Sequence, residues 1–189
     1  AVPLGILTAV RKNGVFDKTV QVLTIVGYSI PTFIIALLAI FLLAVKIPIF
    51  PISGVRSAGS TATGLAAALD MLRHMVLPVL VMSVSGIGSI TRYVRAAMID
   101  VLRMDYIKTA RAKGLREKTV IYIHAFRNAL IPVVTITTWW IIGLFGGSVV
   151  IESVFLWNGL GKMLIDGLMN RDFSIVLTMQ MFYVLLSLA

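Results

Sequence analysis

The sequence contains no cysteine and few acidic residues: eight Asp and Glu stand against 17 Lys and Arg in a chain of 189 residues. The absence of cysteine excludes structural disulfides and metal sites with cysteine ligands. The two histidines, His74 and His124, lack the HxxxH or HExxH spacing of a zinc site, so no metal site is predicted. Charged residues make up only 13% of the chain, and the mean hydropathy is +0.98. This composition lies outside the range of soluble domains and indicates a membrane protein.

Charge is absent from runs that are long enough to cross a bilayer. Residues 19–45 and 128–151 hold no Asp, Glu, Lys or Arg, and each run exceeds the roughly 20 residues that a spanning helix needs. Residues 74–91 form a shorter run, which suffices if the arginines that follow extend to the interface. These runs predict an all-α fold, a polytopic transmembrane helical bundle. The predicted spans are residues 19–45, with a kink at Pro31, residues 75–98 and residues 129–150.

The two ends of the chain carry shorter apolar stretches. As helices, residues 1–10 would reach about 15 Å and residues 173–189 about 25 Å, less than the hydrocarbon thickness of about 30 Å. Arg11 and Lys12 follow the first stretch instead of preceding it, unlike the basic residues of a signal peptide. We interpret the two stretches as the end of one span and the start of the last one. Residues 1–189 are therefore expected to be a single transmembrane domain that is incomplete at both ends.

Positive charge is concentrated on one side of the predicted membrane. Because helical spans alternate in direction, residues 11–18 and 92–127 share one side and carry twelve Lys and Arg. Residues 46–73 and 152–172 share the other side and carry five. The positive-inside rule places the first pair in the cytoplasm. Residues 99–128 are predicted to form a cytoplasmic loop. Residues 46–74 and 151–172 are predicted to be external segments, and the first of them is expected to contain a short helix at 65–72.

The cytoplasmic loop has the pattern of a helix, a turn and a second helix. An apolar stripe at spacings of three and four predicts an amphipathic helix with basic residues on its other face. Gly114 stands where helices commonly end in a glycine, and the sequence LREKTVIYIHAF that follows predicts a second helix. The stripe consists of Ile99, Leu102, Tyr106 and Ala110, and the basic residues opposite are Arg103, Lys108 and Arg111.

Three functions of this loop compete. A solvated face that fixes the topology and a surface that adheres to anionic lipid both account for its charge. A docking element for a soluble protein accounts also for the interleaved apolar residues and for the turn at Gly114, since adhesion to lipid needs no turn at a defined place. Docking is therefore the favoured interpretation, and nucleic acid is not an expected partner.

The sequence lacks a catalytic constellation. The stretch NGLGKM at residues 158–163 differs from a phosphate-binding loop, because Leu156 stands in place of its first glycine and Met163 in place of Ser or Thr. ATP, if it is used, must therefore be bound by another chain. No acidic residue lies inside a predicted span, which disfavours a secondary transporter driven by protons or sodium. Trp139 and Trp140 fall about 15 Å into the third span and are expected to pack within the bundle or to line a pathway.

Several stretches resemble one family. TARAKG at Thr109–Gly114, followed by HAFRNALIP at His124–Pro132, resembles the EAA loop of the permease subunits of binding-protein-dependent ABC importers. The general pattern has an acid where this chain has Lys108, a change that the dipeptide, oligopeptide and nickel transport subgroup commonly tolerates. The other similar stretches are AVPLGILTAVRKNGVFDKTV near the start, GYSIPTF at Gly27–Phe33 and ESVFLWNGLGKMLIDGLMNRDFSIV at Glu152–Val176.

The resemblance implies a permease subunit of an ATP-driven importer for peptides, in the cytoplasmic (plasma) membrane of a bacterium or archaeon. A coupling helix in the cytoplasmic loop would dock on an ATPase subunit, and Ile107, Ala110 and Leu115 are expected to be buried in that contact. The chain itself is expected to be no enzyme and to bind no cofactor, with ATP and Mg held by the ATPase. The implied partners are two ATPase subunits, a second homologous permease subunit, an extracytoplasmic substrate-binding protein and the lipid bilayer.

The residues expected to dock are Ile107, Lys108, Thr109, Ala110, Arg111, Ala112, Lys113, Gly114 and Leu115. Trp139 and Trp140 are the candidates for lining the translocation path. The alternative functions are a stand-alone membrane scaffold with a basic loop that binds lipid or protein, and a secondary transporter.

Overall fold

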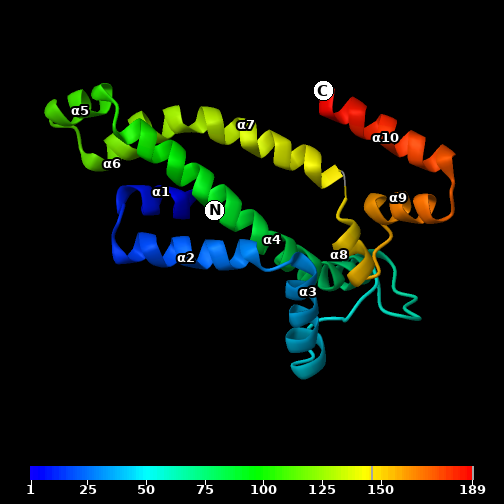
Figure 1. Cartoon of the computed structure of the whole chain (residues 1–189). Coiled ribbons are helices and arrows are strands. Elements are labelled where there is room, and N and C mark those ends of the chain that lie inside the picture. The colour runs from blue at the N-terminus through cyan, green and yellow to red at the C-terminus, as the bar shows by residue number, and fades with distance from the viewer. Residues whose placement is uncertain (146, 189) are drawn as a thin grey trace. The chain divides into compact units, whose positions relative to one another are not determined.

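The computed structural model describes residues 1–145 and 147–188, which form helices joined by turns and one longer loop (Figure 1). No β-strand occurs in these two ranges, and the predicted all-α class is confirmed. The first helices are α1 (Val2–Val10), α2 (Val15–Ser29), α3 (Thr32–Ile40) and the π-helical η1 (Phe41–Lys46). The middle ones are α4 (Gly64–Leu102), α5 (Asp105–Ala112), α6 (Glu117–Thr119), the π-helical η2 (Val120–Ala125) and α7 (Phe126–Phe145). The last are α8 (Val149–Val154), α9 (Leu160–Met169) and α10 (Phe173–Leu188).

Among the described residues, two helical stretches are long and apolar enough to cross a membrane, Gly64–Leu102 and Glu117–Gly143. The pair Val15–Ser29 and Thr32–Lys46 supplies a third if it is counted as one broken span. The break falls at Pro31, whose φ of −55° and ψ of 135° lie outside the helical region. Proline has no backbone N–H with which to continue a helix, so the kink predicted at Pro31 is confirmed and takes the form of a break.

Helix α4 begins earlier than the sequence pattern predicts. It starts at Gly64, so the helix predicted at 65–72 is confirmed as helical, but it does not end at 72 and forms the first turns of α4. The reason is that nothing interrupts the helix between this segment and the apolar run. Pro78 lies inside α4 without ending it, because one missing backbone hydrogen bond is tolerated in a long apolar helix.

The chain forms two compact units. The first consists of residues 1–29 and 84–139 and contains one cluster of buried apolar side chains from α1, α4, α5, η2 and α7. Gly5 lets α1 lie close to α4, since a Cβ at this position would stand 2.6 Å from Cβ of Val94. The buried cluster is Ile6, Ala9, Val94, Met98, Val101, Ile107, Ala110, Val120, Ile121, Ala125, Ala129 and Val133.

The second unit consists of residues 30–83 together with the described residues of 140–188. Within it α3 packs on α8, α8 on α9 and α9 on α10. The loop after η1 is tied to this unit because the N–H of Gly54 donates to the carbonyl of Phe155 at 2.8 Å. The buried apolar cluster of this unit is Ala36, Ala44, Leu77, Val81, Ile151 and Phe155.

Candidate docking loop

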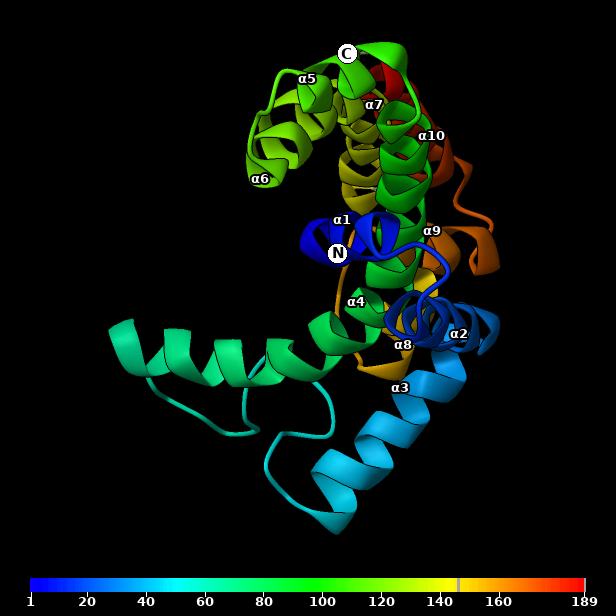
Figure 2. The same cartoon turned by 90° about the vertical axis from the view of Figure 1, so that its left-hand side faces the viewer.

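Helix α5 is the centre of the predicted docking loop and lies, with α6, just beyond the C-terminal end of α4 (Figures 1 and 2). Its first turn contains Asp105 and its last turn Arg111, the charge order that the helix dipole favours. The helix ends at Ala112, Lys113 is its C-cap, and Gly114 follows with a φ of +75°. The glycine predicted to end this helix is therefore confirmed, because a side chain at this φ would be strained.

The prediction of one continuous helix from Ile99 to Ala110 was wrong, because two helices cover this range. Helix α4 ends at Leu102, and Met104 is extended, with a φ of −71° and a ψ of 150°, before α5 begins. Ile99 and Leu102 therefore belong to the long helix, and Ala110 belongs to the short one. The chain turns here because Ile107 and Ala110 are buried in the cluster of the first unit, which a straight continuation of α4 would not allow.

Burial divides the predicted docking residues into two groups. Ile107 is fully buried and Ala110 is 7% exposed, both within the chain's own cluster beside residues such as Met98 and Val120. The expectation that these two side chains enter a partner's groove is therefore wrong, because their surface is already covered. Leu115 is 40% exposed, so its side chain can still contact a partner protein.

The exposed face of the loop combines apolar side chains with positive charge. Met104 is 49% exposed, and Tyr106 and Leu115 are each 40% exposed. Within the described chain, the cations of residues 103–118 that form no ion pair are Arg103, Lys113, Arg116 and Lys118. Apolar side chains flanked by unpaired cations suit a protein surface that is both apolar and acidic.

Two ion pairs lie within the loop. Nζ of Lys108 donates to Oδ1 of Asp105 at 2.8 Å, and this hydrogen bond lowers the pKa of the Asp105 carboxyl. Arg111 donates to both carboxylate oxygens of Glu117, at 2.7 and 3.2 Å, and the carboxylate raises the pKa of Arg111. Both pairs are exposed to solvent, so they add little stability, but the second connects α5 to α6 across the turn at Gly114.

Trp139 and Trp140 are not interior residues of the described chain. Trp139 is 64% exposed and Trp140 is 37% exposed. This chain itself therefore leaves much of both side chains uncovered, and their packing within the bundle stays a prediction. Their assignment to a translocation path stays a prediction.

Glu152 joins the start of α8 to the start of α9 through hydrogen bonds, a role that the sequence did not predict. Its carboxylate accepts the N–H of Ser148 at 3.0 Å and the N–H of Lys162, in the first turn of α9, at 2.7 Å. A Cβ on Gly147 or Gly159 would stand within 2.6 Å of this carboxylate, so both positions need glycine. The signal in the sequence is an acid among closely spaced glycines, in GSVVIESVFLWNGLG from Gly147 to Gly161.

Asp17 and Arg95 form an ion pair that sequence reasoning also missed. Nε and Nη2 of Arg95 donate to the two oxygens of Asp17, each at 2.7 Å, and Asp17 is 2% exposed. The pair joins α2 to α4 across 78 positions of sequence. The one available signal was that Asp17 is the only acid in the first 69 residues of the sequence.

Comparison with known proteins agrees with the resemblance seen in the sequence. The family model described as "Binding-protein-dependent transport system inner membrane component" matches residues 1–189. The oligopeptide transport system permease protein AppB of Bacillus subtilis is 38% identical over 179 residues, 95% of this chain and 55% of the relative. The dipeptide transport system permease protein DppB of Escherichia coli K12 is 37% identical over 192 residues, 93% of this chain and 57% of the relative. The chain thus spans about half the length of these relatives.

Proposed function

Since the chain belongs to the family of binding-protein-dependent transport system inner membrane components, we propose that it forms the translocation path of an ATP-driven peptide importer and couples it to a separate ATPase. As a member of this family it is a transport permease and a multi-pass protein of the plasma membrane. The proposed substrates are peptides, because similar relatives are named oligopeptide and dipeptide permeases.

The exposed face of α5 and of the turn after it carries the proposal. This docking face is defined by Met104, Tyr106 and Leu115 together with the unpaired cations Arg103, Lys113, Arg116 and Lys118. In the proposed importer the face lies in the cytoplasm, within the predicted loop 99–128, and contacts an ATPase subunit. Ile107 and Ala110 support the contact from inside, because their burial ties α5 to the rest of the first unit. A movement of the ATPase would then displace a packed unit and not a free loop.

The other components follow from this assignment. Two ATPase subunits would hold ATP and Mg, a second homologous permease would complete the path, and an extracytoplasmic binding protein would deliver the peptide to the outer segments. This chain would supply no catalytic group and no cofactor site. The GLGK stretch gives no support to a nucleotide site, since its glycines face the carboxylate of Glu152 and the segment around Val149.

A substitution at Gly114 tests the docking face. Gly114→Val is expected to cost about 1–2 kcal/mol of backbone strain at a φ of +75°, which the chain relieves by shifting Leu115 relative to α5. Retention of the ATPase on purified importer membranes and peptide uptake should each fall by about tenfold.

Gly59→Val is the matched control. Gly59 has a φ of +73°, and a Cβ at either glycine would meet no atom within 4 Å, so the two substitutions introduce similar strain in similar space. Because Gly59 lies in the predicted external segment, its substitution should leave ATPase retention within about twofold of the parent. Equal retention by the two variants would argue against docking through this loop.

A further inference from the structure

Helix α2 contacts the rest of the first unit mainly through polar residues. Its buried residues are Asp17 and Thr24, and the whole of this helix is described. Most apolar side chains of α2 face outward: Val22 is 59% exposed, Leu23 65% and Val26 51%, while Phe16 and Val20 are partly buried. Helix α1, in contrast, contributes Ile6 and Ala9 to the buried cluster. The position of α2 therefore depends mainly on polar and close backbone contacts, because its fully buried residues are polar.

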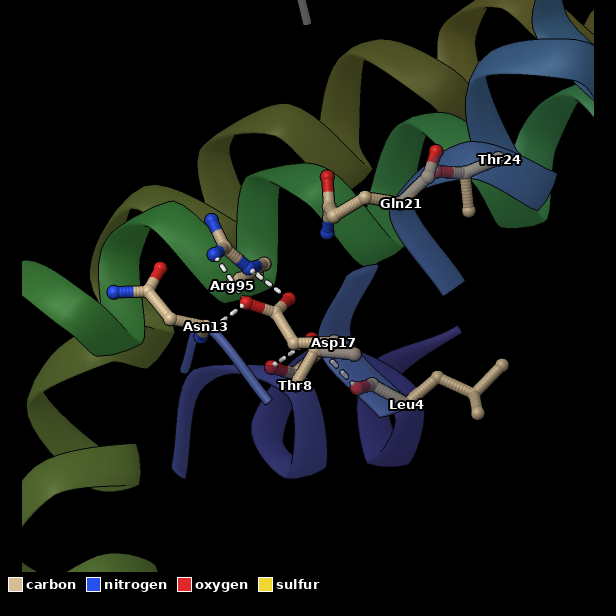
Figure 3. Close-up of polar contacts among 8 residues, drawn as sticks. Leu4, Thr8, Asn13, Asp17, Gln21, Thr24 and Arg95 are labelled. Carbon is tan, nitrogen blue, oxygen red and sulfur yellow. Dashed lines mark hydrogen bonds and ion pairs between the residues drawn. The ribbon is translucent and has the colours of Figure 1, made fainter. Parts of the chain in front are cut away.

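The strongest of these contacts is the ion pair between Asp17 and Arg95 (Figure 3). Both donor–acceptor distances are 2.7 Å, the short bidentate geometry of a strong charge-assisted pair. Oδ2 of Asp17 also accepts the N–H of Asn13 at 2.9 Å, and Asn13 has a φ of +65° in the turn between α1 and α2. One carboxylate thus fixes both the turn before α2 and the contact of α2 with α4.

Further contacts join α2 and α4 beyond the ion pair. They involve later residues of α2 and earlier residues of α4. A Cβ on Gly88 would stand 3.2 Å from the carbonyl oxygen of Thr24, and one on Gly27 would stand 3.3 Å from Val84. The guanidinium of Arg92 lies 5.0 Å from the centre of the Tyr28 ring. Helix α2 therefore lies antiparallel along α4, with small residues at the close approaches and the ion pair at one end.

Arg95 also lies beside the residues that hold α5. Val94 and Met98, which are adjacent to Arg95 in sequence or one turn away, are fully buried in the cluster that contains Ile107. A displacement of α5 must pass to α4 through this packed cluster, since close-packed interiors transmit strain. It reaches α2 through the contacts of α2 with α4, and also through α1, which packs in the same cluster and contacts α2.

We propose that Asp17 and Arg95 are positioning residues that fasten α2 to α4, so that α2 moves with α5 during transport. The inference rests on the proposed function for its role in transport, but the attachment itself can be tested without transport. When the pair is broken, α2 should separate from α4, and the importer should hydrolyse ATP without a matching uptake of peptide.

The first experiment measures the attachment in membranes. The chain is free of cysteine, so Thr24→Cys and Gly88→Cys introduce a single reporter pair. An ideal Cβ at position 88 lies 3.6 Å from Cβ of Thr24, within the range of about 3.5–4.5 Å that a disulfide requires. The rate of disulfide formation should fall by about tenfold when Asp17→Asn is added, because a charge-assisted bond is lost. Both arms carry the same cysteine pair, so any strain from the pair cancels in the comparison.

Asp100→Asn and Arg95→Gln complete this experiment. Asp100 is an exposed acid on α4 that forms no ion pair within the described chain, so its amide variant should leave the disulfide rate unchanged. Arg95→Gln should lower the rate as Asp17→Asn does, because either change breaks the pair. Unchanged rates in both the Asp17 and the Arg95 variants would overturn the inference.

The second experiment uses the complete importer in proteoliposomes, with its ATPase and binding protein, and measures peptide uptake per ATP hydrolysed. Asp17→Asn should lower this ratio by about tenfold, and the oxidised disulfide between positions 24 and 88 should restore it until a reductant is added. A normal ratio in Asp17→Asn, or a low ratio that the disulfide leaves unchanged, would overturn the positioning role. If the parent importer takes up no peptide, the proposed function fails, while the disulfide rates still decide whether the pair fastens α2.

Discussion

Replacing Ile107 with alanine is expected to weaken the folding of the chain itself, with a loss of about 2–5 kcal/mol in the free energy of unfolding. Ile107 is fully buried and packs in the cluster that joins α4, α5, η2 and α7. Truncation leaves a cavity in that cluster and releases α5. Thermal unfolding of the purified importer in detergent measures the loss. Faster proteolytic cleavage between Leu102 and Glu117 would locate it.

Leu115→Ala provides the contrast. Leu115 is 40% exposed, so its truncation should change the free energy of unfolding by less than about 0.5 kcal/mol. If Leu115 contacts the ATPase, retention of that subunit should fall by about tenfold, the effect of losing roughly 1–2 kcal/mol at an interface. The opposite result, in which Leu115→Ala unfolds the chain and Ile107→Ala only loses the ATPase, would contradict the assignment of Ile107 to the interior.

The parts of the fold that the sequence predicts are those determined by neighbouring residues. The break at Pro31 depends on the backbone chemistry of a single residue. The end of α5 depends on the φ that Gly114 adopts at no steric cost. The helical character of the long uncharged runs follows from their length and composition, because backbone groups in a bilayer must be satisfied within the segment.

The parts that the sequence does not predict depend on contacts between distant residues. The apolar residues interleaved in the loop, such as Ile107 and Ala110, indicate burial, but the pattern is the same whether a partner or the chain itself covers them. The structure shows that α4, η2 and α7 cover them, which also requires the turn at Met104. The ion pair of Asp17 with Arg95 joins residues that sequence spacing does not relate. The best sequence-based prediction of the docking loop therefore identified the segment correctly as a helix and a turn, but assigned two of its side chains to the wrong contact.

A second large effect is expected at Gly159. An added Cβ there would stand 2.3 Å from Cδ of Glu152 and 2.5 and 2.6 Å from its carboxylate oxygens. The carboxylate cannot move away without leaving the N–H groups of Ser148 and Lys162 unsatisfied. Gly159→Ala should therefore cost about 3 kcal/mol, through overpacking and the loss of these hydrogen bonds. Thermal unfolding of the importer measures the cost.

Gly143→Ala separates this steric effect from the general effect of adding a methyl group. Gly143 lies in α7 with no atom within 4 Å of an added Cβ, so alanine should be neutral or should stabilise the helix by up to about 1 kcal/mol. A double variant, Glu152→Ala with Gly159→Ala, completes the argument. Because the alanine at position 152 removes the atoms that the new Cβ would meet, the double variant should be no less stable than Glu152→Ala alone. Additive losses would show that the Cβ at position 159 clashes with something other than the carboxylate, and that Glu152 does not set the requirement for glycine.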